Sequence, residues 1–191
     1  MINKSNNFNN IKTPMELLKY MDNITYGFIG RNGKKYTDMN STDWNDWYDE
    51  CLVQTGENVL ITNIGTCYDQ VEIERLWFHK NNYNFKTIFA WFEVDRENDF
   101  PTHTFLIYES NNKWYWFEHA WYDFKGIHEF NSEKEILNCF IKKHYEFVKQ
   151  NHKDLLDSDK DKLKCYEYEK INKNLSVQEY FEHVTLHKLN I

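Results

Sequence analysis

Cys67 stands where a cysteine side chain has the best opportunity for chemistry. It follows the turn-prone pair Gly65-Thr66 and precedes a segment, ending near Phe78, with apolar residues at helical spacing. We therefore expect Cys67 in the first turn of a mostly buried helix. Unpaired N–H groups and the positive end of the dipole favour a thiolate there, although a buried structural cysteine is the alternative. The same N–H groups would hold a substrate oxyanion, with a second donor such as Asn63 from the preceding loop.

A thiolate nucleophile needs a histidine within hydrogen-bonding reach, and His103 is the best placed of the eight histidines. It opens a β-prone segment directly after Pro101-Thr102. His79 ends the Cys67 helix, where a cation suits the helix dipole without any catalytic role. The remaining late histidines fall on helices or connectors, where we expect them at the surface: His144, His152, His183 and His187.

A third polar group usually orients the histidine ring, and a β-hairpin supplies a candidate in Glu118. A loop of two or four residues centred on Asn111-Asn112 would place His103 and Glu118 on one face as diagonal neighbours, about 7–8 Å apart along the backbone. A three-residue loop would reverse this parity and favour His119 instead. The plainer interpretation of Glu118 is an exposed carboxylate, but its flanks are aromatic and apolar.

This layout resembles that of transglutaminase-like proteins, which belong to the papain-like cysteine enzyme superfamily. The matching elements, within about residues 59–121, are Gly65-Thr66-Cys67, Thr102-His103-Thr104 and Trp116-Phe117-Glu118. The third member is usually an aspartate in that family, so Asp123 is a second candidate for the acid. The resemblance implies a Cys-bearing helix packed on an antiparallel β-sheet with flanking helices.

The resemblance also implies acyl-enzyme chemistry by a Cys67-His103-Glu118 triad, in a protease, deamidase or transglutaminase type of cysteine hydrolase or acyltransferase. A peptide, protein or small amide would be the substrate. A non-catalytic binding or inhibitory module that keeps the fold is the alternative. A metal site built from His103, Glu118, His119 and His128 is disfavoured, because strand alternation separates Glu118 from His119 and no HExxH spacing exists. No cofactor motif is present either, since the sequence has neither GxGxxG nor a Walker loop.

Composition bounds the class of protein. The chain has 191 residues, 41% hydrophobic and 18% aromatic, which predicts one folded domain over residues 11–191 after a flexible polar tail over residues 1–10. A net charge of −7 without a basic block disfavours nucleic acid and anionic membranes as partners. The polar N-terminus is unlike a secretory signal, and the four cysteines show no CxxC spacing, so we expect free thiols in the cytoplasm. Composition does not indicate an oligomeric state.

The order of predicted elements gives an α+β fold, in which helices lead, an antiparallel sheet follows and helices close the chain. Capping patterns begin three of the helices, with Thr13-Pro14 at the first and a Ser-x-x-Glu box at Ser132 and again at Ser176. Helices are expected at about residues 14–21, 41–54, 67–80, 133–150 and 177–187. Extended segments are expected at about 24–29, 59–64, 84–94, 102–109, 113–120, 126–130 and 163–171.

Overall fold

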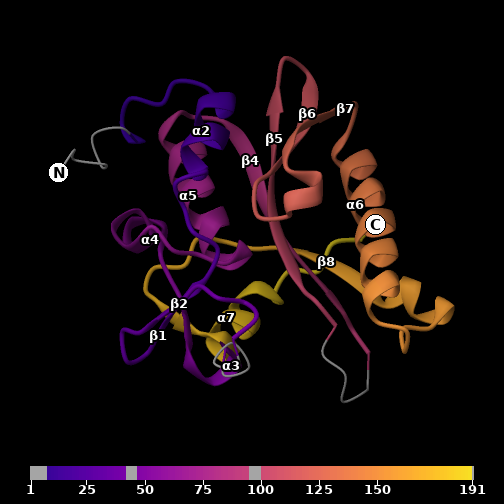
Figure 1. Cartoon of the computed structure of the whole chain (residues 1–191). Coiled ribbons are helices and arrows are strands. Elements are labelled where there is room, and N and C mark those ends of the chain that lie inside the picture. Colours follow the sequence, from indigo (N-terminus) through magenta and orange to yellow (C-terminus); the bar gives the residue numbers. More distant parts are fainter. Residues whose placement is uncertain (1–7, 42–46, 95–99, 191) are drawn as a thin grey trace.

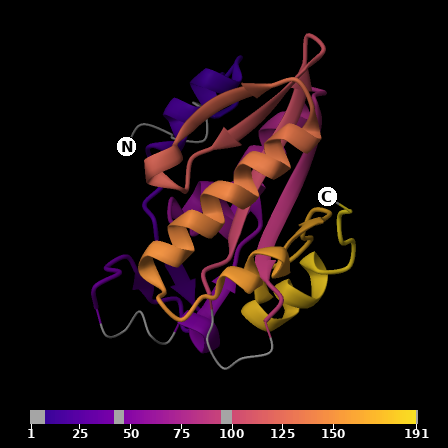
Figure 2. The same cartoon turned by 90° about the vertical axis from the view of Figure 1, so that its right-hand side faces the viewer.

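A computed structural model describes residues 8–41, 47–94 and 100–190 of the chain. Its main feature is a five-stranded antiparallel sheet with the strand order β7-β6-β5-β4-β8 (Figure 1). Its strands are β4 (Asn84–Phe92), β5 (His103–Ser110), β6 (Lys113–Glu118), β7 (Gly126–Phe130) and β8 (Leu163–Glu167). The helix α5 (Cys67–Lys80) covers one face of this sheet, and α6 (Glu133–Asn151) crosses the other (Figures 1 and 2).

A second, smaller antiparallel sheet has the order β2-β1-β3-β9 and joins the N-terminal part of the chain to the C-terminal part. Its strands are β1 (Phe28–Gly30), β2 (Lys35–Tyr36), β3 (Cys51–Val53) and β9 (Leu175–Ser176). The remaining helical elements are α2 (Pro14–Met21), α3 (Trp47–Glu50), α4 (Gly56–Thr62), η2 (Tyr122–Phe124), η3 (Asp157–Lys162) and α7 (Val177–Val184). The predicted α+β class is therefore confirmed.

The two faces of the large sheet carry separate cores, as strand alternation requires. On one face Phe105 stacks on Phe140 of α6, with ring centroids 4.4 Å apart. On the other face Phe117 meets Phe78 of α5 edge-to-face at 5.6 Å. The Cys67 helix is thus held by an aromatic core on one side of the sheet, and α6 by a second core on the opposite side.

The β5–β6 hairpin has the predicted register. Leu106 pairs with Phe117 and Ser110 with Lys113, which leaves a two-residue loop. Asn111 and Asn112 both have positive φ, at 51° and 59°. Asparagine tolerates this conformation, and two such residues form the turn that matches the twist of a hairpin. The even loop length puts His103 and Glu118 on one face, as expected.

Two predicted elements in the N-terminal third are wrong. The helix expected over residues 41–54 is only the short α3, and the chain then enters β3 at Cys51; residues 42–46 lie outside the described residues. The extended segment expected over residues 59–64 is instead the end of α4, because Thr55 caps this helix by accepting a hydrogen bond from the Asn58 N–H. The strand expected over residues 24–29 is confined to Phe28–Gly30.

Local signals elsewhere are confirmed. The hydroxyl groups of Thr13, Ser132 and Ser176 each accept a hydrogen bond from the backbone N–H three residues later, at the starts of α2, α6 and α7. In the stretch expected as a flexible tail, residues 1–7 lie outside the described residues. Phe8 does not belong to a tail, because its side chain is 7% exposed in the core next to Tyr20.

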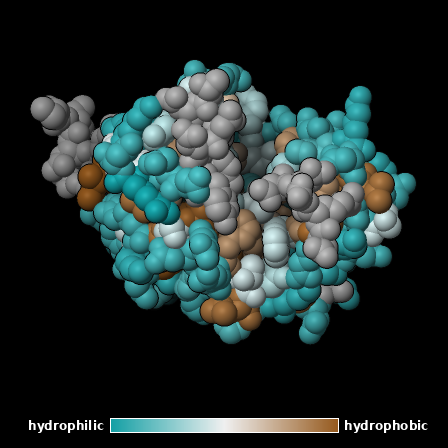
Figure 3. Space-filling view, turned by 90° about the horizontal axis from the view of Figure 1, so that it is seen from below, coloured by the Kyte–Doolittle hydropathy of each residue, from teal (hydrophilic) through white to brown (hydrophobic). Residues whose placement is uncertain are grey.

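The described surface is mostly hydrophilic when seen from below, and apolar residues gather near the middle of that face (Figure 3). Within residues 8–41, 47–94 and 100–190, no helix combines the length and the apolar character needed to cross a bilayer.

Candidate active site

Cys67 is the first residue of α5, and a buried carboxylate fixes the loop that leads into it. Asp69 is fully buried and accepts hydrogen bonds from the Thr66 N–H at 2.8 Å and from the Gln54 N–H at 2.6 Å. Burial raises the pKa of Asp69 to about 7, although these hydrogen bonds oppose the rise. A Cβ at Gly65 would lie only 2.7 Å from the Cβ of Asp69, so this close approach requires glycine.

Two side-chain contacts attach the first turn of α5 to the open end of the β5–β6 hairpin. The Tyr68 hydroxyl forms a short hydrogen bond with the Thr102 hydroxyl, next to the start of β5. The Gln70 Oε1 atom lies 2.6 Å from Nδ1 of His119, just after the end of β6. These contacts bring Cys67 to the end of the sheet where His103 begins β5.

His103 lies between Cys67 and Glu118 and interacts with both. Its Nε2 atom is 2.8 Å from Oε2 of Glu118, and the Cys67 side chain is close enough to the ring to raise its pKa. Burial by itself would lower the pKa of His103. The charge of Glu118 and the hydrogen bonds to Cys67 and Glu118 outweigh burial and raise this pKa to about 10. The ring is therefore an imidazolium at neutral pH.

Glu118 is a buried carboxylate that accepts hydrogen bonds from neighbouring protein groups. Its side chain is 1% exposed, and Oε2 also accepts a hydrogen bond from Nε1 of Trp116 at 3.2 Å. Oε1 accepts one from the backbone N–H of Trp121 at 2.8 Å. The second acid candidate, Asp123, is exposed in η2 and has no hydrogen bond to His103 within the described part of the chain. The geometry thus selects Glu118 as the partner of His103.

Aromatic side chains enclose the outer side of the His103 ring. Phe140 and His144 of α6 lie nearly parallel to it, with centroids at 6.0 Å and 6.2 Å, and Trp121 meets its edge at 5.7 Å. His144 bonds through Nε2 to the Pro101 carbonyl at 3.0 Å. Burial and the neighbouring charge of His103 lower the pKa of His144 to about 3, so it is neutral. The expectation that His144 lies at the surface is wrong, because α6 turns this position toward the sheet.

Tyr26 is a site residue that the sequence does not reveal. A parallel bridge between Thr25 and Ile64 lays the preceding chain beside the loop before Cys67. The Tyr26 phenol is close enough to Cys67 that burial and the charge of this thiol both raise its pKa. Asn63, the expected second oxyanion donor, is instead the left-handed cap of α4, and its amide nitrogen donates to the Ile61 carbonyl at 3.4 Å. No local pattern predicts this proximity, because the residues involved are brought together by the bridge.

Of the four residues of the disfavoured metal hypothesis, His103 and Glu118 are in contact, whereas His119 and His128 bond to other groups. His119 bonds to Gln70 and Asp22, and Nε2 of His128 lies 2.9 Å from the Phe124 carbonyl. Within the described residues, no group of three or more histidine, cysteine, aspartate or glutamate side chains is arranged to hold a metal ion.

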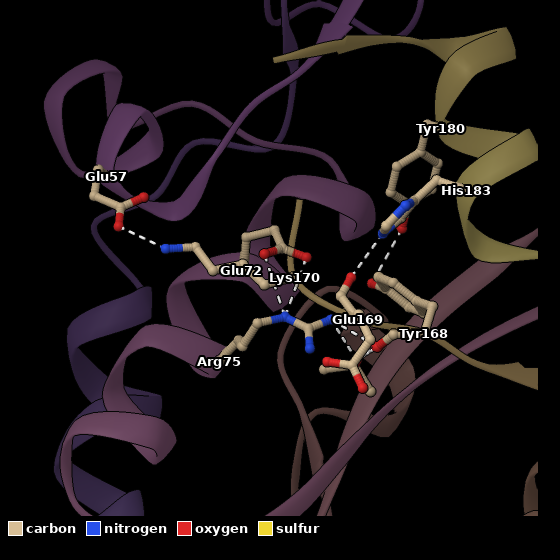
Figure 4. Close-up of polar contacts among 9 residues, drawn as sticks. Glu57, Glu72, Arg75, Tyr168, Glu169, Lys170, Tyr180 and His183 are labelled. Atoms are coloured by element: carbon tan, nitrogen blue, oxygen red, sulfur yellow. Dashed lines mark hydrogen bonds and ion pairs between the residues drawn. The ribbon is translucent and has the colours of Figure 1, made fainter. Parts of the chain in front are cut away.

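A buried charged network anchors α5 away from Cys67 (Figure 4). The Arg75 Nε atom lies 3.3 Å from Oε2 of Glu72, and its guanidinium also donates to the Tyr168 carbonyl at 3.2 Å and to the Thr87 hydroxyl. Burial raises the pKa of Glu72 to about 7 against the opposing effect of Arg75. Figure 4 shows how this network continues to α7, where the Tyr180 hydroxyl donates to that of Tyr168 at 3.1 Å.

No protein-family model matches the chain, and comparisons with curated proteins and with solved structures found no match. The site combines a thiol at a helix start, a buried imidazolium next to that thiol, and a buried carboxylate hydrogen-bonded to the imidazolium. This series can hold a thiolate, deliver a proton and keep the ring in one orientation.

Proposed function

We infer that the protein is a cysteine-dependent hydrolase or acyltransferase that acts on amides or esters through an acyl-enzyme. Cys67 is the nucleophile, His103 the general acid and base, and Glu118 the residue that orients the ring. The observation that carries this proposal is the Cys67-His103-Glu118 series, which begins at the first residue of α5. The helix start and the adjacent imidazolium place positive charge beside the Cys67 sulfur.

The reaction begins with attack of the Cys67 sulfur on the substrate carbonyl carbon. Glu118 occupies Nε2 of His103, which leaves Nδ1 to handle the proton of the thiol. His103 gives this proton to the leaving amine or alkoxide as the carbon–nitrogen or carbon–oxygen bond breaks, which leaves a thioester on Cys67. Water or an amine then attacks the thioester and loses its proton to His103, and the thiolate is released.

A transglutaminase-like core of the papain-like superfamily is the fold assignment that we propose with this chemistry. Three features support it: a Cys-bearing helix on an antiparallel sheet, a histidine at the first residue of one strand, and an acid at the last residue of the neighbouring strand. The substrate class that follows is a peptide, a protein or a small amide. We also propose a cytoplasmic location, which agrees with the four unpaired thiols.

A binding or inhibitory module is the second candidate, and one observation favours it. Cys67 and His103 are each only 7% exposed, so a substrate has restricted access to the pair. A module that uses the fold without catalysis would keep the buried His103–Glu118 contact for stability alone.

Iodoacetamide labelling of each cysteine, resolved by mass spectrometry across pH, separates the two candidates. Burial raises the pKa of Cys165 to about 12 and also raises that of Cys51, so both should stay unlabelled. The enzyme proposal predicts rapid labelling of Cys67 at pH 6 and loss of this reactivity in His103→Ala. If Cys67 labels as slowly as Cys51 and Cys165 in the wild type, the binding module is the better account.

A further inference from the structure

Two side chains of α5 hold the peptide unit that lies just before Cys67. The Thr66 N–H donates to Oδ2 of Asp69 at 2.8 Å. The Gly65 carbonyl accepts a hydrogen bond from Nε2 of Gln70 at 2.9 Å, and the side chains of Asp69 and Gln70 are both buried. This N–H and this carbonyl are the two ends of one planar peptide bond. The orientation of the chain that enters Cys67 is therefore fixed from both sides.

The Gln70 amide is held in turn by His119, and the contacts fix which atom each side chain presents. A carbonyl oxygen only accepts hydrogen bonds, so the Gly65 contact requires the amide nitrogen of Gln70 at that place. The amide oxygen of Gln70 therefore faces His119, whose Nδ1 atom lies 2.6 Å away. An oxygen acceptor at this distance requires a proton on Nδ1. The neutral ring of His119 is thus the Nδ1–H tautomer.

The other ring nitrogen of His119 has a different neighbour. Nε2 lies 3.3 Å from Oδ1 of Asp22 at the C-terminal end of α2, and the Lys125 ammonium also binds this carboxylate. Asp22 therefore has a cationic partner whether or not the His119 ring is charged. Burial is the largest effect on the His119 ring and lowers its pKa, and the charge of Lys125 acts in the same direction. The Nδ1–H donor that Gln70 needs is present in both the neutral ring and the imidazolium.

We propose that Gln70 and His119 are positioning residues that hold the start of α5, and with it Cys67, against the end of the large sheet. This inference rests on the proposed acyl-enzyme chemistry. His119 directly follows Glu118 in the chain. The same end of β6 therefore supports the nucleophile through His119 and orients the ring of His103 through Glu118. The series of contacts from β6 to the loop before α5 keeps these two parts of the site in register.

Two amide substitutions of His119 test this role, because they place a hydrogen-bond donor at different positions. The amide nitrogen in His119→Asn is bonded to Cγ, as Nδ1 is, whereas that in His119→Gln lies one atom farther out, as Nε2 does. The readout is acetylation of Cys67 by p-nitrophenyl acetate, which forms a thioester, releases nitrophenolate and is followed by mass spectrometry. Displacement of a reacting group by about 1 Å can slow a reaction by about 10²-fold. His119→Gln should therefore slow acetylation by about 10–10²-fold, and His119→Asn should recover most of the rate.

Asp22→Asn is the matched control, because it changes the group that faces Nε2 and leaves the Nδ1 contact with Gln70 in place. Its acetylation rate should equal that of the wild type. The double variant Gln70→Leu/His119→Gln should be no slower than the slower single variant, because both changes break the same series of contacts. Iodoacetamide labelling of the buried Cys51 and Cys165 reports unfolding in every variant. A positioning role predicts slower reaction of Cys67 while these two thiols stay unlabelled.

NMR of the histidine ring nitrogens in the wild type is a second measurement that needs no variant. It should show the proton of the neutral His119 ring on Nδ1, and a neutral ring with its proton on Nε2 would overturn the proposal. A His119→Gln variant as fast as the wild type would also overturn it, as would equal losses in His119→Asn and His119→Gln. A wild type whose Cys67 is not acetylated removes the proposed function together with this inference, whereas the other outcomes remove the inference alone.

Discussion

His103 Nε2 lies 2.8 Å from Glu118 Oε2, and the two side chains are 9% and 1% exposed. A carboxylate this deeply buried is stable only when its acceptors are satisfied, and here the donors are His103, Trp116 and the Trp121 N–H. The contact therefore fixes the ring orientation and its charge together. It is also the contact whose removal most directly tests how the site operates.

Glu118→Gln should reduce the reactivity of Cys67. Without the carboxylate, burial is the dominant effect on His103, so its pKa should fall from about 10 toward or below its ordinary value. The rate of Cys67 alkylation at pH 7 should drop by about 10–30-fold, because an ordinary cysteine thiol is only a few per cent thiolate at this pH. The measurement is the pH dependence of iodoacetamide labelling, with the ring titration of His103 followed by NMR. Glu109→Gln, on the same hairpin, is the control. It should leave the alkylation rate of Cys67 and the pKa of His103 unchanged.

His144 should make the protein less stable in acid. Its folded-state pKa of about 3 lies below the ordinary value of 6.5, so its contribution is complete above pH 6.5 and is lost as the pH falls toward 3. The free energy of unfolding should fall by up to about 1.4 kcal/mol for each pH unit in this window. In His144→Gln this part of the pH dependence should disappear, as measured by urea denaturation at a series of pH values. Identical slopes in the two proteins would contradict the assignment.

The charge on His103 makes stability depend on pH in the opposite direction from His144, with the loss at high pH. Because its folded-state pKa is raised to about 10, its contribution to stability is complete below pH 6.5 and is lost as the pH rises through 10. The wild type should therefore lose stability between about pH 7 and 10 more steeply than Glu118→Gln, in which the raised pKa is absent. Thermal unfolding at pH 6 and at pH 10 checks this, and parallel losses in both proteins would argue against a buried imidazolium.

Gly65→Ala should disturb the loop before Cys67. The new Cβ would lie 2.7 Å from the Cβ of Asp69, whose carboxylate holds the Thr66 and Gln54 N–H groups. Overpacking of this kind costs about 1–3 kcal/mol, and displacement of the helix start should also slow Cys67 alkylation. Gly33→Ala is the matched control, because its Cβ meets open space and only the positive φ of 77° opposes it. Gly33→Ala should lose some stability in urea denaturation, and its rate of Cys67 alkylation should equal that of the wild type.

Arg75→Met should destabilise the fold without altering the triad. It leaves the buried Glu72 carboxyl without its cationic partner, a change that typically costs about 3–5 kcal/mol. The double variant Glu72→Leu/Arg75→Met removes both charges and should recover most of that loss in urea denaturation. Equal losses in the single and double variants would show that Arg75 acts through its bonds to Thr87 and Tyr168 rather than through Glu72.

The elements that the sequence predicts well are those fixed by contacts within a few residues. The caps at Thr13, Ser132 and Ser176 bond three residues ahead, so their side chains specify where each helix starts. The pair Asn111-Asn112 specifies a two-residue turn, and this turn sets the register that places His103 beside Glu118. The expected start of α5 at Cys67 depends on equally local backbone preferences.

The misjudged elements depend on contacts between distant segments. Helix α3 ends where β3 begins because Cys51–Val53 pairs with β1 and with β9. Strand β9 lies more than a hundred residues later in the chain. His144 is buried because α6 packs across the sheet, and no neighbour in sequence reports that contact. Tertiary packing overrides the intrinsic secondary-structure propensity of the residues in β3 and the usual surface exposure of a helical histidine.

The sequence by itself therefore determined the α+β class, the hairpin parity and the position of Cys67 at a helix start, because hydrogen bonds within a few residues specify them. Only the tertiary structure decided that Glu118 rather than Asp123 meets His103, and that Asp69 and Glu72 are buried. These facts depend on hydrogen bonds and desolvation between segments far apart in the chain, which sequence spacing does not encode.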